Sequence, residues 1–172
     1  MDIRAQILSA HSRANADLVL NYVLDDKGRV KPLMKLFLGE EYRVAQRLAM
    51  VVGDLGRFRP AWLHPWHEPM IAAANAPLHD SVKRNVLRYF SELPLGAVGE
   101  EQEGELLDVA FRLFESPLEA VAIRVYGMQI VANYAEHFPE LKDELRAVIE
   151  ITIAEGATPG FRSRGQKILK RL

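Results

Sequence analysis

Five arginines are the first residues in this sequence that could bind a macromolecular partner. Three of them, with Asn85, follow one another at a spacing close to 40 residues, and two lie nearby; the five are Arg47, Arg84, Arg88, Arg124 and Arg164. On neighbouring helices such a column would form a basic strip suited to an acidic protein segment or to a phosphodiester backbone. The alternative is a ladder of ion pairs that holds neighbouring repeats in register, with acids such as Asp54, Asp80, Glu92 and Glu119.

A second cluster combines aromatic and imidazole side chains in a proline-containing segment, residues 62–69. Trp62 and Trp66 could stack on a base or line the rim of a binding surface, or else fill an irregular turn between repeats. His64, His67 and Glu68 contain metal-ligating atoms. A helical metalloprotease motif needs two histidines four residues apart, whereas Pro65 interrupts this shorter spacing, so we predict no metal site.

Catalytic motifs are not evident. His79 and Asp80 are adjacent, and adjacent residues on a helix point about 100° apart, so they do not form an acid–base pair. Asp80 is more simply a first-turn carboxylate favoured by the helix dipole. The sequence has no phosphate-binding glycine loop, nucleophile elbow or dinucleotide fingerprint. We therefore expect no catalytic residue and no cofactor, and the sequence favours a binding protein over an enzyme.

These residues occur within a weak internal repeat. Similar stretches begin at residues spaced by 38, 39 and 40 positions: Val44, Val82, Val121 and Phe161. Within each stretch, positions 4, 7, 8 and 11 are mostly apolar, which is the spacing of one face of an α-helix. We expect this face, together with Val82 and Val121, to be buried. A period near 40 residues accommodates two helices per unit.

Turn signals divide the chain into helices. We predict a helix at 3–24, kinked near Ser12, and then helices at 29–38, 41–55, 69–75, 79–93, 101–115, 116–137 and 139–155, with the last beginning at Thr158–Pro159. Ser116, Pro117 and Glu119 read as the N-cap, first residue and third residue of a helix. The prediction is an all-α superhelix (solenoid) of about four repeats in one domain, 1–172. Its repeats would be 1–27 (partial), 28–60, 61–95, 96–138 and 139–172.

Two segments resemble the turn and second helix of HEAT or armadillo-type repeats. Residues 80–84 (Asp-Ser-Val-Lys-Arg) and 117–121 (Pro-Leu-Glu-Ala-Val) match best, although the basic residue after the valine is alanine at Ala45 and Ala122. The resemblance covers about residues 28–172 and implies a protein-binding scaffold whose second helices line a concave face. The chain is more distantly similar to HEAT-like DNA-alkylation-repair glycosylases, which implies nucleic-acid binding as an alternative.

Composition limits the remaining classes. The 172 residues contain no cysteine, which excludes disulfides and thiolate metal sites. We expect a cytoplasmic protein with no membrane span, because neither a signal peptide nor a long apolar stretch is apparent.

The charges are unevenly distributed along the chain: residues 100–115 have a net charge of −5 and residues 159–172 one of +5. This polarity leaves an end-to-end homodimer open, and the predicted partner contacts are the five arginines with Trp62 and Trp66 at the rim.

Overall fold

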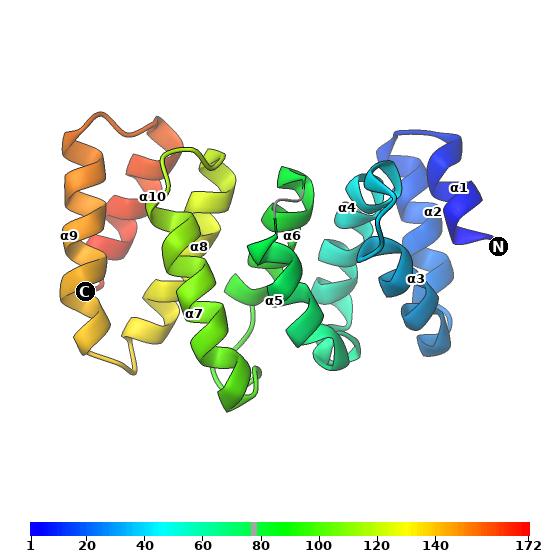
Figure 1. Ribbon diagram of the computed structural model, residues 1–172, viewed down its shortest axis with the longest axis horizontal. Coiled ribbons are helices and arrows are strands. Elements are labelled where there is room, and N and C mark those ends of the chain that lie inside the picture. The colour runs from blue at the N-terminus through cyan, green and yellow to red at the C-terminus, as the bar shows by residue number, and fades with distance from the viewer. Residues whose placement is uncertain (77–78) are drawn as a thin grey trace. The chain divides into compact units, whose positions relative to one another are not determined.

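The computed structural model describes residues 1–76 and 79–172, which form two compact units, Met1–Leu93 and Pro94–Leu172. The described residues of both units are helical, with no strand among them. Figure 1 shows the helices following one another as antiparallel neighbours within each unit. The all-α prediction is confirmed, whereas the prediction of one domain over 1–172 stays a prediction.

The first unit contains six α-helices in its described residues and three short 3₁₀ turns. The helices are α1 (Ile3–Ser9), α2 (Arg13–Leu24), α3 (Val30–Phe37), α4 (Tyr42–Phe58), α5 (His67–Asn75) and α6 (Asp80–Ser91). The turns are η1 (Lys27–Arg29), η2 (Pro60–Trp62) and η3 (His64–Trp66). Helix α4 packs against α2 on one side and α6 on the other, while α3 pairs with α4 and α5 with α6.

The second unit has the same kind of packing. Its helices are α7 (Glu100–Glu115), α8 (Val121–Ala135), α9 (Glu140–Ala154) and α10 (Pro159–Leu169). Helix α7 pairs with α8, α9 pairs with α10, and α8 contacts α10. The buried Phe114 and Phe161 rings stack with their centroids 5.9 Å apart, which joins the two pairs through one apolar core. Sequential pairs of this kind are the arrangement of an α-α solenoid.

The repeated apolar face is confirmed most fully in α4, where Leu48, Val51, Val52 and Leu55 are all buried. In α8 the burial pattern differs from the prediction. Val125 and Gln129 are only half-buried, and Val121 is half-buried as well. Helix α8 contacts α7, α9 and α10, so its buried residues spread around the helix rather than along one stripe.

Three predicted helix boundaries are wrong. The segment 3–24 is two helices, because Ser12 caps a new one: its hydroxyl accepts the N–H of Asn15. Helix α5 begins at His67 rather than at residue 69. Helix α8 begins at Val121 rather than just after Ser116. Ser116 instead follows the last residue of α7, and its hydroxyl accepts the N–H of Leu118, two residues further along, within a turn. A serine hydroxyl can accept a nearby backbone N–H in a turn as well as at the start of a helix, so the local sequence motif did not distinguish a turn from a helix start.

No helix in residues 1–76 and 79–172 is both long enough and apolar enough to cross a membrane.

Candidate functional site

Arg47 of α4 lies against the end of α1. Its Nη1 donates to the carbonyl oxygens of Ile7 (3.2 Å) and Leu8 (2.9 Å). Carbonyls in the last turn of a helix have no partner within that helix, so an arginine from a neighbouring helix can satisfy them. Nη1 of Arg47, a residue predicted to contact a partner, therefore joins α4 to α1.

Arg124 of α8 has a similar role in the second unit. Its Nε donates to the carbonyl oxygen of Phe114, at the end of α7, over 2.9 Å. The guanidinium lies over the Phe161 ring, 4.6 Å from its centroid, in cation–π contact. Burial lowers the pKa of Arg124. The side chain thus links α7, α8 and α10.

Arg164 of α10 donates from Nη1 to Oε1 of Gln129 in α8 over 2.7 Å. The Gln129 amide donates in turn to Oδ1 of Asn133 (2.7 Å). Asn85 is the remaining member of the predicted column; it is buried, and its amide donates to the Ser81 carbonyl oxygen (2.8 Å). The three arginines of the column therefore join neighbouring helices, whereas the hydrogen bond of Asn85 lies within α6.

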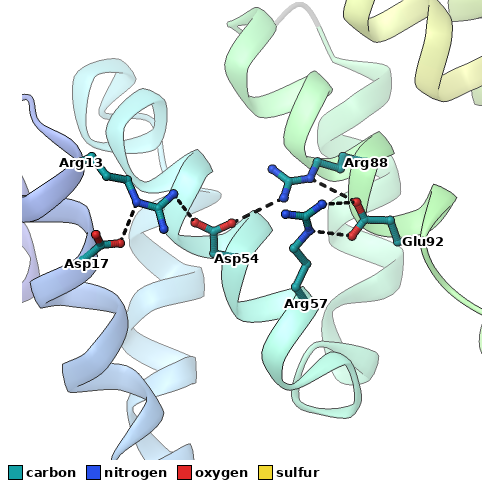
Figure 2. A network of polar contacts seen from close by, with 6 residues as sticks. All are labelled: Arg13, Asp17, Asp54, Arg57, Arg88 and Glu92. Atoms are coloured by element: carbon teal, nitrogen blue, oxygen red, sulfur yellow. Dashed lines mark hydrogen bonds and ion pairs between the residues drawn. The ribbon is translucent and has the colours of Figure 1, made fainter.

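A charged network connects the second helices of the first unit, α2, α4 and α6 (Figure 2). Asp54 of α4, whose side chain is 10% exposed, lies between two guanidinium groups: Arg13 Nη1 is 2.9 Å from Oδ2 and Arg88 Nη2 is 3.5 Å from Oδ1. Arg57 donates to both carboxylate oxygens of Glu92, over 2.9 Å each. The hydrogen bond from Arg57 is the main reason that the pKa of Glu92 is lowered. The ladder alternative is thus realised at Asp54 and Glu92.

Arg84 differs from the other four predicted arginines. It is exposed on α6 and makes no hydrogen bond or ion pair with the residues that the structure describes. It lines a cavity of about 290 Å³ between the α1–α2 turn, α4 and the start of α6. The lining also includes His11, Arg47 and Met50. We call this space the Arg84 cavity, and it is the candidate functional site.

Hydrogen bonds fix the wall of the Arg84 cavity at the start of α6. The Ser81 N–H donates to Nδ1 of His79 (2.9 Å), and the same ring nitrogen is 2.9 Å from the Ser81 hydroxyl. The opposite ring nitrogen of His79 is 3.0 Å from the side-chain amide of Gln46 in α4. Because His79 connects α6 to α4, this part of the wall is held independently of any ligand.

The tryptophan segment is held by a buried polar contact. Nε2 of His67 lies 2.8 Å from the Tyr89 hydroxyl, which donates to the Pro60 carbonyl oxygen (3.1 Å). Burial, with a smaller contribution from His64, lowers the pKa of His67 to about 4, and burial raises that of Tyr89. Trp62 and Trp66 are half-buried in η2 and η3. The structure does not bring them into the Arg84 cavity.

Most residues that line the Arg84 cavity were not predicted from the sequence, and His11 and Met50 are examples. His11 lies between α1 and α2, and Met50 lies on α4 between predicted core positions. Neither is in a motif, and their proximity depends on how α1, α2 and α4 pack. In the described residues, no group of three or more His, Asp or Glu side chains is arranged to hold a metal ion.

The family model of the HEAT repeat domain matches residues 3–172, nearly the whole chain. The chain belongs to the HEAT repeat domain family. HEAT repeats stack helix pairs into solenoids whose extended faces generally bind other proteins. No curated protein and no solved structure shows significant similarity to this HEAT repeat chain. The resemblance inferred from residues 80–84 and 117–121 is thus confirmed at the level of the family.

Proposed function

We propose that this HEAT repeat chain is a scaffold that binds a protein partner through the face formed by α2, α4 and α6. The observation that supports the proposal is Arg84, an exposed cation beside a cavity and without a partner among the described residues. An unpaired guanidinium is suited to fork-like hydrogen bonds with a carboxylate supplied by another chain.

The charges of this face favour a protein over a nucleic acid. Arg13, Arg57 and Arg88 are each paired with an acid, Asp17, Asp54 or Glu92. Binding to a phosphodiester backbone gains most of its free energy from several cations that neutralise phosphates. A face that carries charges of both signs is instead suited to selecting a protein partner whose surface charges are complementary.

The remaining predicted contacts have a supporting role in this proposal. Arg47 and Arg88 already have intramolecular partners, so on this face they contribute through the donors that those partners leave free. Arg124 and Arg164 have such partners too and lie on α8 and α10 of the second unit, so their contact with a partner stays a prediction. Trp62 and Trp66 provide apolar contact area at the rim. A cytoplasmic location and an end-to-end homodimer stay predictions; sedimentation velocity of the purified chain tests the latter.

Affinity capture with purified variants tests the proposal. We expect wild-type protein to retain a specific partner that Arg84→Glu loses by at least about tenfold, because the charge reversal repels an acidic surface. Arg162→Glu is the matched control, since Arg162 is an exposed arginine of α10, outside this face and outside the cavity lining. Equal loss in both variants would contradict a role specific to Arg84.

Nucleic-acid binding is tested separately by fluorescence anisotropy with a labelled DNA duplex and a labelled single strand. We expect no binding at moderate salt. Tight binding that falls steeply with added salt and is weakened by Arg84→Glu would replace the protein-scaffold proposal with nucleic-acid binding.

A further inference from the structure

Two arginines from neighbouring helices line the Arg84 cavity. Arg84 comes from α6 and Arg47 from α4. Arg47 uses Nη1 for the Ile7 and Leu8 carbonyls and forms no other hydrogen bond with the described residues, so its Nε and Nη2 can still donate. Both arginines therefore retain donors for a ligand within one cavity.

The size of the cavity allows a side chain to enter it. About 290 Å³ corresponds to the liquid volume of roughly ten water molecules. This volume is large enough for one polar side chain. The wall is also partly apolar, with Ile7, Ala16 and Met50 among its residues, so it can contact the methylene groups that precede a terminal polar group.

The charge of the lining further restricts that group. Asp80 is the acid among the lining residues, against Arg47 and Arg84, which gives a net charge of +1 with neutral histidines. A monoanion neutralises this charge. A phosphate ester carries about −1.5 to −2 at neutral pH and would leave uncompensated negative charge beside Asp80. The lining is thus better matched to a carboxylate.

We propose that the Arg84 cavity binds the carboxylate of a glutamate or aspartate side chain of the protein partner, with Arg84 and Arg47 donating to its oxygens. This inference rests on the proposed function, because the carboxylate belongs to the protein that the scaffold binds. Hydrogen bonds from guanidinium to carboxylate are about twice as strong as those between neutral groups, so this contact would place one acidic residue on the face.

NMR titration of the full-length chain tests the inference with a defined probe, N-acetyl-glutamate N-methylamide. At constant ionic strength we expect saturable changes in the Nε–H signals of Arg84 and Arg47 and in the amide signal of Ser81. The glutamine analogue, which lacks the charge, should cause no saturable change. We expect Arg84→Gln to weaken binding of the probe about tenfold and Arg162→Gln, on α10, to leave it unchanged.

Two outcomes overturn the inference. One is an equal response to the glutamate and glutamine probes, or no response to either. The other is tighter binding of inorganic phosphate than of the glutamate probe at the same site. If either occurs while partner capture still depends on Arg84, the proposed function stands and the carboxylate assignment fails. Binding of the probe without any captured partner would instead count against the proposed function alone.

Discussion

Gly127 of α8 lies directly against the carbonyl oxygen of Ala110 in α7. A Cβ atom at position 127 would be 2.6 Å from that oxygen and 3.2 Å from Cβ of Phe114. Gly165 of α10 has a similar relationship with α9, where a Cβ would lie 2.8 Å from Cγ2 of Ile149. The absence of a side chain at these two positions allows the helices of the second unit to approach closely.

We expect Gly127→Ala to lower the free energy of unfolding by about 1–3 kcal/mol. The added methyl group meets backbone, which cannot rotate away, and this overpacking exceeds the roughly 1 kcal/mol that alanine gains over glycine in a helix. Gly104→Ala is the control, because no atom of the described residues outside the local backbone of α7 lies within 4 Å of its Cβ position. That variant should gain up to about 1 kcal/mol in urea denaturation. Equal effects of the two changes would argue against the close approach.

Asp54→Asn should destabilise the first unit by about 1–3 kcal/mol. The change removes the charge that two arginines share at a side chain only 10% exposed, and a nearly buried carboxylate is costly to replace when its cations remain. Asp17 binds Arg13 at the surface with a side chain 43% exposed. Asp17→Asn should therefore cost less than about 1 kcal/mol in the same denaturation measurement. A larger loss for Asp17→Asn than for Asp54→Asn would contradict the ladder.

Acid should destabilise the protein through His67, which is 5% exposed. Its pKa is about 4 when folded, against about 6.5 in the unfolded chain, so the unfolded state binds the proton first as the pH falls. The contribution of His67 to stability is complete above pH 6.5 and is lost progressively down to about pH 4. Between pH 7 and pH 5 we expect this histidine to cost about 2 kcal/mol.

Two measurements check that prediction. NMR of the His67 ring should show titration near pH 4, and titration at an ordinary imidazole pKa would contradict burial as the cause. In urea denaturation, the free energy of unfolding should fall less between pH 7 and pH 5 for the His67→Gln variant than for the wild type. Both proteins contain the same carboxylates, so the difference isolates the histidine.

Val82→Asp and Val121→Asp should differ although both valines begin the repeated stretch. Val82 is 1% exposed, so aspartate there buries an unpaired charge and should cost at least about 3 kcal/mol. Val121 is half-buried and is the first residue of α8, where a carboxylate interacts favourably with the helix dipole. We expect Val121→Asp to cost about 1 kcal/mol or less. Thermal melting of both variants decides between this expectation and equal burial.

Prediction from sequence succeeded where the determining interactions are local. The spacing of apolar residues in α4 and the glycines and prolines between helices depend on neighbours within a few turns, and the helix pairs follow from them. It failed at Ser116 because the same hydroxyl can cap a helix or close a turn. Only the packing that followed decided between the two.

The sequence by itself determined that this chain forms stacked helix pairs of the HEAT type. The tertiary structure decided which arginines are free to bind a partner. Arg47 and Arg124 donate to main-chain carbonyls in the last turn of a neighbouring helix. Every residue has a main-chain carbonyl, so no side-chain pattern identifies those acceptors. Arg84 differs from Arg88 only in what lies beside it, and that depends on how α4 and α6 pack.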